Sequence, residues 1–206
     1  MIAKQWIVAT LAGSAIPAIA ALPSMHSGGE LGTSWIFLLP IAQTLLVSIS
    51  QAFVLHKHFS SVLVWIPITT LGSLAAELFS MISIGAGPGP SDLSTGIIFT
   101  IVGGLAAFFY SAILLGLPQR RFFRRRSWNV EGWVVATGSG SAVASISLLG
   151  MGILALNAEL AWLPTAGSSN EAFVMVFAQV WYWVPIAVFQ ALVLHRLPPR
   201  PPISRA

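Results

Sequence analysis

The sequence predicts an all-α integral membrane protein: a bundle of six transmembrane helices made of three tandem two-helix repeats around a pseudo-threefold axis along the membrane normal. Three observations lead to this prediction. Hydrophobic residues make up 56% of the 206 residues and charged residues only 8%, against roughly 25% charged in an ordinary soluble domain. If six long apolar stretches each cross the membrane, all Lys and Arg residues lie at the same face of it. In addition, a motif with polar residues recurs in every second stretch.

The six stretches are long enough to span a membrane, because about 20 apolar residues in a helix cross a hydrocarbon core of about 30 Å. The first stretch also resembles a signal peptide, with Lys4, an apolar run and the small residues Ala18-Ile19-Ala20. We expect it to be retained as a helix, because it carries the recurring motif. The predicted spans cover residues 5–22, 35–55, 61–84, 95–117, 130–156 and 171–195.

The basic residues predict how the helices are oriented. With six spans, all of them lie at the N-terminus, in the second and fourth loops, or in the C-terminal tail: Lys4, Lys57, Arg120, Arg121, Arg124, Arg125, Arg126, Arg196, Arg200 and Arg205. The other three loops contain no Lys or Arg and carry Glu30, Asp92 and Glu159. Cytoplasmic loops collect Lys and Arg. We therefore expect both termini in the cytoplasm, with the protein in a bacterial inner membrane or a thylakoid membrane.

A motif of four residues recurs near the start of each odd-numbered span. The spacing Trp-x3-Thr-x2-Gly-Ser begins at Trp6, at Trp65 and at Trp133. We interpret the tryptophans as anchors at the membrane interface and the small residues as points of close helix packing. The repeat units are expected at about 6–57, 65–126 and 133–196.

The ends of the even-numbered spans also resemble one another. Gln-Ala-x-Val-Leu-His occurs at residues 51–56 and again at 190–195, and we interpret 111–116 as a degenerate copy that has lost the Gln and the His. Units with an even number of spans all point the same way, so the repeats are related by an axis along the membrane normal. We predict a single transmembrane domain over residues 1–206, in which the proline-rich tail 197–206 is extended.

Gln51, His56, Gln190 and His195 are candidate binding residues at the ends of two spans. The amides either cross-link helices through hydrogen bonds or contact a ligand. The histidines either sit favourably at the negative ends of helix dipoles or ligate a pigment such as chlorophyll. The sequence leaves these alternatives open. No metal site is predicted.

Glu77 is the only acidic residue well inside a predicted span, twelve residues past Trp65. A helical rise of about 1.5 Å per residue places it beyond the midplane, toward the outer face. An ionisable group at such a depth is a functional candidate by default. Glu77 either handles protons or cations, or is a structural carboxyl group held by hydrogen bonds.

The fourth loop contains five arginines within seven residues, interleaved with Phe122 and Phe123: Arg120, Arg121, Arg124, Arg125 and Arg126. Such a cluster is typical of attraction to anionic lipids, worth about 1 kcal/mol per basic residue near the surface. Docking of an acidic protein partner is the alternative. Nucleic acid is not an expected partner for so short a loop.

The segment from Gln51 through Lys57 to Trp65 and Gly72 resembles uncharacterised multipass membrane proteins of cyanobacteria and other bacteria. In that pattern a Gln near a helix end, an aliphatic pair and a basic residue precede a short loop, and a Trp and a Gly seven positions on follow it. His56 stands where Arg is common in the family. The resemblance covers about a third of the chain. It implies a type of organism rather than an activity.

No catalytic constellation is found in the sequence. The stretch from Gly138 to Ser141 resembles the serine motif of rhomboid proteases, but the only late histidine is His195, at the very end of a span. We therefore expect a non-enzymatic accessory, stabilising or assembly subunit of a larger membrane complex. The resemblance implies a photosynthetic or other bioenergetic host complex, and membrane lipids and other subunits are the expected partners. The alternative is a small proton- or cation-linked transporter or channel that uses Glu77.

Overall fold

The computed structural model describes residues 2–26, 30–59, 61–85, 93–126, 128–157 and 169–196. This part of the chain is helical apart from short turns and contains no strand, which confirms the all-α prediction. A π-helix, η1 (Ser111–Gly116), joins α4 to α5. The helices are α1 (Ile2–His26), α2 (Glu30–His56), α3 (Trp65–Gly85), α4 (Leu93–Tyr110), α5 (Leu117–Arg124), α6 (Trp133–Asn157) and α7 (Ser169–His195).

Five apolar segments of the described residues are long enough to cross a membrane, as expected of a multipass membrane protein. They are Ile2–Ala21, Leu38–His56, Ser94–Arg124, Trp133–Met151 and Phe177–His195. Each overlaps one of the predicted spans. The remaining predicted span, 61–84, overlaps α3 but begins four residues before it, and its place in a membrane stays a prediction.

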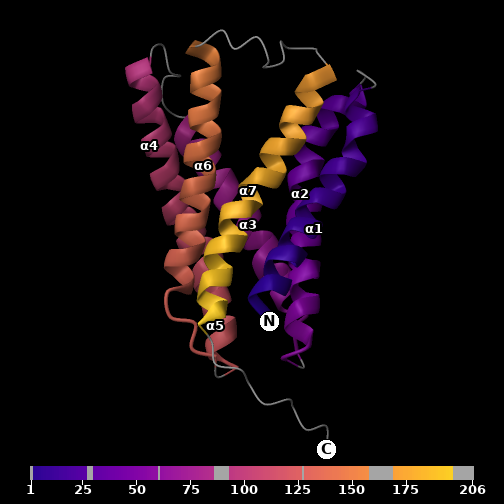
Figure 1. Cartoon of the computed structure of the whole chain (residues 1–206), viewed down its shortest axis with the longest axis vertical. Helices are drawn as coiled ribbons and strands as arrows, with labels where there is room; N and C mark the ends of the chain where they lie inside the picture. Colours follow the sequence, from indigo (N-terminus) through magenta and orange to yellow (C-terminus); the bar gives the residue numbers. More distant parts are fainter. Residues whose placement is uncertain are drawn as a thin grey trace, which may run out of the picture.

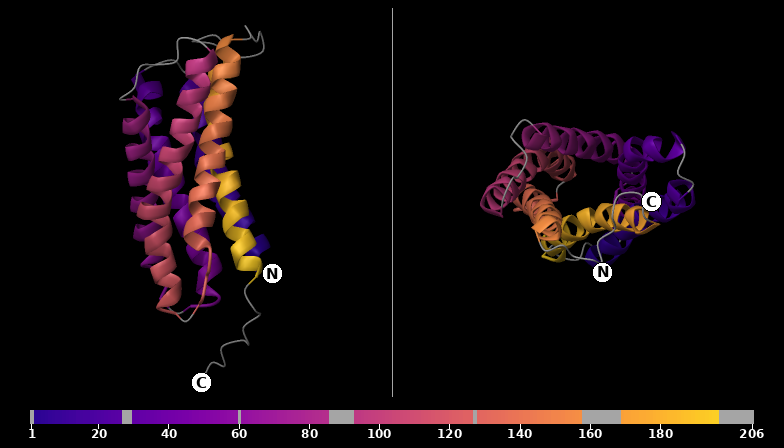
Figure 2. Two further views of the ribbon diagram at one scale, coloured as in Figure 1. Left: turned by 90° about the vertical axis from the view of Figure 1, so that its left-hand side faces the viewer. Right: turned by 90° about the horizontal axis from the view of Figure 1, so that it is seen from above.

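The helices pack in chain order into a closed ring. Each contacts the helix before it and the helix after it, with α4 against α6 and α7 against α1. Figure 2 shows this ring from above, and Figure 1 shows the helices side by side. The side chains of α1, α3 and α6 that face the ring axis are therefore brought close together, although their sequences are far apart.

All the described basic residues gather at one end of the ring, which we call the basic end. The start of α1, the end of α2, α5 and the end of α7 all lie there (Figure 1). The compartment that this end faces stays a prediction. Asp92, Glu159, Arg200, Arg205 and the tail 197–206 lie outside the described residues.

The fourth span is longer than predicted. Tyr110 and Leu117, which flank η1, both have right-handed helical dihedrals, so α4, η1 and α5 run without a break from Leu93 to Arg124. The segment predicted to be an arginine-rich loop is helical as far as Arg124. Arginine is a good helix former, and burial of Phe122 and Phe123 ties this end of the helix to the core.

Gly13, Gly72 and Gly140 lie at points where α1, α3 and α6 pack closely against the main chain of a neighbouring helix. An added Cβ would meet main-chain atoms of the facing helix, at 2.7 Å from Val47 Cα, 2.7 Å from the Leu114 carbonyl oxygen and 2.6 Å from Ile186 Cα, respectively. Small residues permit this approach in membrane helices. Glycine at these positions thus sets the spacing of the side chains around the axis.

Candidate functional site

Three tryptophans meet at the ring axis near the basic end. Trp6, Trp65 and Trp133 come from α1, α3 and α6, and all three are fully buried. Their ring centroids are 5.6, 5.7 and 6.4 Å apart, and every pair is edge to face. The interpretation of these residues as interfacial anchors is wrong. They form a core contact, in which each edge-to-face pair adds about 0.5–1.5 kcal/mol.

Each of these indoles donates a hydrogen bond to a buried glutamine. The distances from Nε1 to Oε1 are 3.2 Å for Trp65 to Gln51, 3.0 Å for Trp133 to Gln119 and 3.1 Å for Trp6 to Gln190. Each bond joins two different helices: α3 to α2, α6 to α5, and α1 to α7.

Each glutamine amide donates in turn to a threonine hydroxyl. The distances from Nε2 to Oγ1 are 2.9 Å for Gln51 to Thr10, 3.0 Å for Gln119 to Thr69 and 3.0 Å for Gln190 to Thr137. We call these nine residues the Trp–Gln–Thr ring. It closes on itself, because Gln51 links α1 to α3, Gln119 links α3 to α6, and Gln190 links α6 back to α1.

Gln51 and Gln190, two of the predicted site residues, therefore lie inside the protein as helix cross-links. Each is only 1% exposed. In both, the amide oxygen and the amide nitrogen are engaged in the ring. The geometry corresponds to the first of the two alternatives, in which these amides join helices.

Gln119 is the member of the ring that the sequence analysis missed. The interpretation of residues 111–116 as a degenerate copy of segments 51–56 and 190–195 is wrong. Those residues form η1, and the equivalent glutamine, Gln119, lies in α5. A signal was present: 14 residues separate Gln51 from Trp65, and 14 separate Gln119 from Trp133. This spacing was overlooked because the neighbouring arginines led to the prediction of a loop rather than a helix at Gln119.

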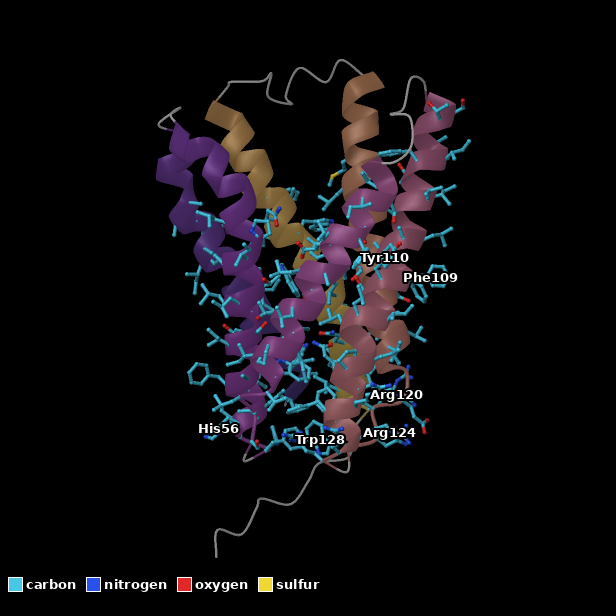
Figure 3. All side chains as sticks on the ribbon, turned by 180° about the vertical axis from the view of Figure 1, so that it is seen from behind. His56, Phe109, Tyr110, Arg120, Arg124 and Trp128 are labelled. Carbon is cyan, nitrogen blue, oxygen red and sulfur yellow. The ribbon has the colours of Figure 1, made fainter. Side chains whose placement is uncertain are left out.

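The two candidate histidines lie away from the ring. His56 and His195 end α2 and α7, and both are exposed at the basic end; Figure 3 shows His56 there. Neither contacts the other site residues through a described hydrogen bond. Their position leaves them open to a partner outside the chain.

The arginines divide into two groups. Arg121, Arg124 and Arg125 are exposed and Arg120 is half-buried; Figure 3 shows Arg120 and Arg124 at the basic end. Arg126 differs, because its guanidinium carbon lies 3.7 Å from the centroid of the Phe122 ring. It also donates to the main-chain oxygens of Phe122 and Ser61, and so fastens the turn between α2 and α3 to α5.

A cluster of aromatic rings covers the three tryptophans on the side of the basic end. Phe122 lies 5.2 Å from Trp65 and Phe123 lies 4.8 Å from Trp133, both measured between ring centroids. Phe59 and Trp128 add a second layer, 4.7 Å apart. The axis is therefore filled by side chains from the Trp–Gln–Thr ring to the basic end.

A layer of serines lies on the other side of the ring, one helical turn further from the basic end. Ser14, Ser73 and Ser141 are buried on α1, α3 and α6. Ser14 donates to the carbonyl of Leu11 at 3.0 Å. Among the described residues, the Ser73 hydroxyl has no hydrogen-bond partner. Since an unpartnered buried hydroxyl costs about 1–3 kcal/mol, this atom is a place where water or a polar ligand group would bind.

Glu77 lies one further turn along α3, in a cavity of about 230 Å³ between α3, α6 and α7. Ser80 and Ser145 line the cavity with it, and α7 contributes Gln179 and Tyr182. Tyr182 also lies beside Ser141, so the cavity adjoins the serine layer. Figure 1 shows α7 leaning away from α6 toward the end opposite the basic end.

The lining of this cavity contains an acidic side chain but no basic one. It contains one carboxyl group, four other polar side chains and three aliphatic ones, and none of its lining residues is basic. A negative charge on Glu77 would therefore be balanced by a bound proton or cation. Among the described residues, no cluster of three or more His, Asp or Glu side chains is arranged to hold a metal ion.

Comparisons of the chain with protein-family models, with curated proteins and with solved structures found no match.

Proposed function

We propose that the protein is a small proton- or cation-linked transporter whose binding site is the cavity around Glu77. One observation carries this proposal: a lone carboxyl group shares a cavity with Ser80, Ser145, Gln179 and Tyr182, without a basic side chain in its lining. Intramembrane carboxyl groups are expensive, and they typically mark ion or proton pathways.

The size of the cavity indicates the size of the substrate. Its volume is about 230 Å³, below the roughly 300–1,000 Å³ of sites for drug-sized ligands. A proton carried with water, a monovalent cation or a small organic ammonium ion would fit. Hydroxyl and amide oxygens are suitable partners for each of these.

The Trp–Gln–Thr ring and its aromatic cover act, in this proposal, as the closed gate. They lie between the cavity and the basic end, so a solute moving along the axis would have to open them. The conformation described here then corresponds to a state closed at the basic end. We also propose that the basic end faces the cytoplasm, as the distribution of Lys and Arg predicts.

We further propose that the chain consists of three equivalent two-helix units around a pseudo-threefold axis. The supporting observation is that the same set of contacts occurs three times. In each set an indole donates to a glutamine, that glutamine donates to a threonine, and a glycine packs against the main chain of the facing helix. The units differ at Glu77, because Ala18 and Ser145 occupy the corresponding turn of α1 and α6.

Flux measurements in reconstituted vesicles test the proposed function. Glu77→Gln removes the charge with little change in size and should abolish proton-coupled or cation flux, while Glu77→Asp should retain part of it. Glu131→Gln is the matched control, because Glu131 is exposed at the basic end, outside the cavity. Unchanged flux in Glu77→Gln, or no flux of protons, monovalent cations or small ammonium ions in the parent protein, would overturn the proposal.

A second candidate function is that of an accessory or assembly subunit of a larger membrane complex. The exposed His56 and His195, together with the exposed arginines of α5, lie at one end of the ring, where a partner could contact all of them. Extraction of native membranes in mild detergent would test this. Migration only as a lone species of 21.9 kDa would count against it, and the absorption spectrum of an intact assembly would reveal pigment.

A further inference from the structure

A groove runs along the outside of the helix ring between α1 and α2, close to the basic end. This open groove has a volume of about 470 Å³ and shares no lining residue with the Glu77 cavity. Its lining combines two lysines, Lys4 and Lys57, with apolar side chains that include Val8, Ala12 and Phe53. The groove therefore has a charged part and an apolar part.

The two lysines approach the groove from different helices. Lys4 lies in the first turn of α1 and Lys57 directly follows the last residue of α2, and both are exposed. None of the residues that line the groove is acidic. The uncharged polar side chains of Gln5 and Ser50 lie in the same lining. The charged part of the groove therefore suits an anion, and Gln5 directly follows Lys4 in the chain.

The apolar part of the groove extends away from the basic end. Val8 and Phe53 are 66% and 72% exposed, although both lie in helices long and apolar enough to cross a membrane. Such side chains are solvated by lipid chains. The short side chains of Ala9 and Ala12 leave the space between the two helices open.

The pair of lysines distinguishes this helix pair from the other two. Lys4 stands two positions before Trp6, whereas Leu63 and Glu131 stand two positions before Trp65 and Trp133. The residue six positions after each ring glutamine is basic in every case. Only the α1–α2 pair therefore combines two basic residues at these positions.

We propose that this groove binds one anionic phospholipid. The headgroup phosphate lies between Lys4 and Lys57, and an acyl chain follows Val8, Ala12 and Phe53 into the hydrocarbon layer. Lysine acts on a phosphate as a compact point charge, and its aliphatic stem lies along apolar surface while its ammonium group reaches the headgroup level. The proposal is independent of the function assigned to Glu77.

Lipid binding by the purified full-length chain tests the proposal. Phosphatidylglycerol and phosphatidylcholine with identical acyl chains would be titrated in mild detergent at about 0.15 M salt, with bound lipid counted by native mass spectrometry. We expect the parent to prefer phosphatidylglycerol. In Lys4→Gln/Lys57→Gln, the affinity for phosphatidylglycerol should fall roughly 30-fold, because each basic residue contributes roughly fivefold.

Two further variants separate this site from general attraction to the basic end. Arg121→Gln/Arg124→Gln removes the same charge from residues that do not line the groove, and should leave the affinity within about twofold because salt screens exposed charges. Ala12→Trp keeps both lysines and fills the apolar part, and should abolish tight binding. Ala12 is exposed, so this variant should fold, which helical circular dichroism would verify.

The outcomes divide clearly. The proposed lipid site is supported if Lys4→Gln/Lys57→Gln and Ala12→Trp both lose the preference for phosphatidylglycerol. The Arg121→Gln/Arg124→Gln variant should keep that preference. Equal binding of the two lipids by the parent would overturn the proposal, as would an unchanged preference in the lysine variant. Inorganic phosphate that competes as well as phosphatidylglycerol would also overturn it, because the site would then bind free anions rather than a lipid.

Discussion

The indole nitrogen of Trp6 lies 3.1 Å from the side-chain oxygen of Gln190, which is 184 positions later in the chain. This hydrogen bond joins the first helix to the last. It turns two local links, Gln51 to Trp65 and Gln119 to Trp133, into a closed circuit around the axis. The start of α1 is thereby held to α7 near the basic end.

Removing the N–H group at Trp6 should destabilise the protein. Trp6→Phe keeps an aromatic ring but removes the donor to Gln190. Loss of this hydrogen bond should lower the free energy of unfolding by about 0.6–1.7 kcal/mol, and the smaller ring should lower it further through lost packing contacts. Trp65→Phe and Trp133→Phe should give similar losses if the three units are equivalent. Thermal unfolding in detergent measures all three. An effect for Trp65 and Trp133 but none for Trp6 would show that the circuit is open in solution.

Loss of Gln119 should be costly, although it lies among arginines at the end of a helix. Gln119→Leu leaves the buried Trp133 N–H without its acceptor, and an unsatisfied buried donor costs about 1–3 kcal/mol. The double variant with Trp133→Phe should then be less destabilised than the sum of the single variants. Unfolding free energies of the four proteins give the coupling. Strict additivity would contradict the hydrogen bond.

Alanine at Gly72 should disturb the contact between α3 and η1. Its Cβ would lie 2.7 Å from the carbonyl oxygen of Leu114, and this main-chain atom moves only if the helices separate. Overpacking of this kind costs about 1–3 kcal/mol. Gly150→Ala is the matched control, because a Cβ there meets nothing within 4 Å and alanine favours helix. Equal midpoints of thermal unfolding for the two variants would argue against close packing at Gly72.

Labelling of introduced cysteines should reveal the orientation. The chain contains no cysteine, so each single-cysteine variant carries one reactive thiol. Arg121→Cys at the basic end should react with a membrane-impermeant maleimide only after the cells are opened. Ser94→Cys, at the start of α4, should react in intact cells. The reverse pattern would place the basic end outside.

Local sequence patterns were sufficient for some features of the site. Glu77 could be identified because an acidic residue in an apolar helix has no local partner, and its distance from Trp65 along α3 follows from the helical rise. The spacing of Trp6, Thr10 and Ser14 placed these residues on one face of a helix. The direction of that face could not be predicted, because a tryptophan at the start of a helix has the same sequence environment at a lipid headgroup as at a buried axis.

The sequence by itself determined the all-α class, the apolar segments and the gathering of basic residues at one end, because each depends only on residue type and helical periodicity. Tertiary structure decided the rest. It paired Trp6 with Gln190, continued the fourth span through Arg124, and placed Tyr182 beside the helix of Glu77. These features depend on which helices touch, and the contacts join residues too distant in the chain for a local pattern to reveal.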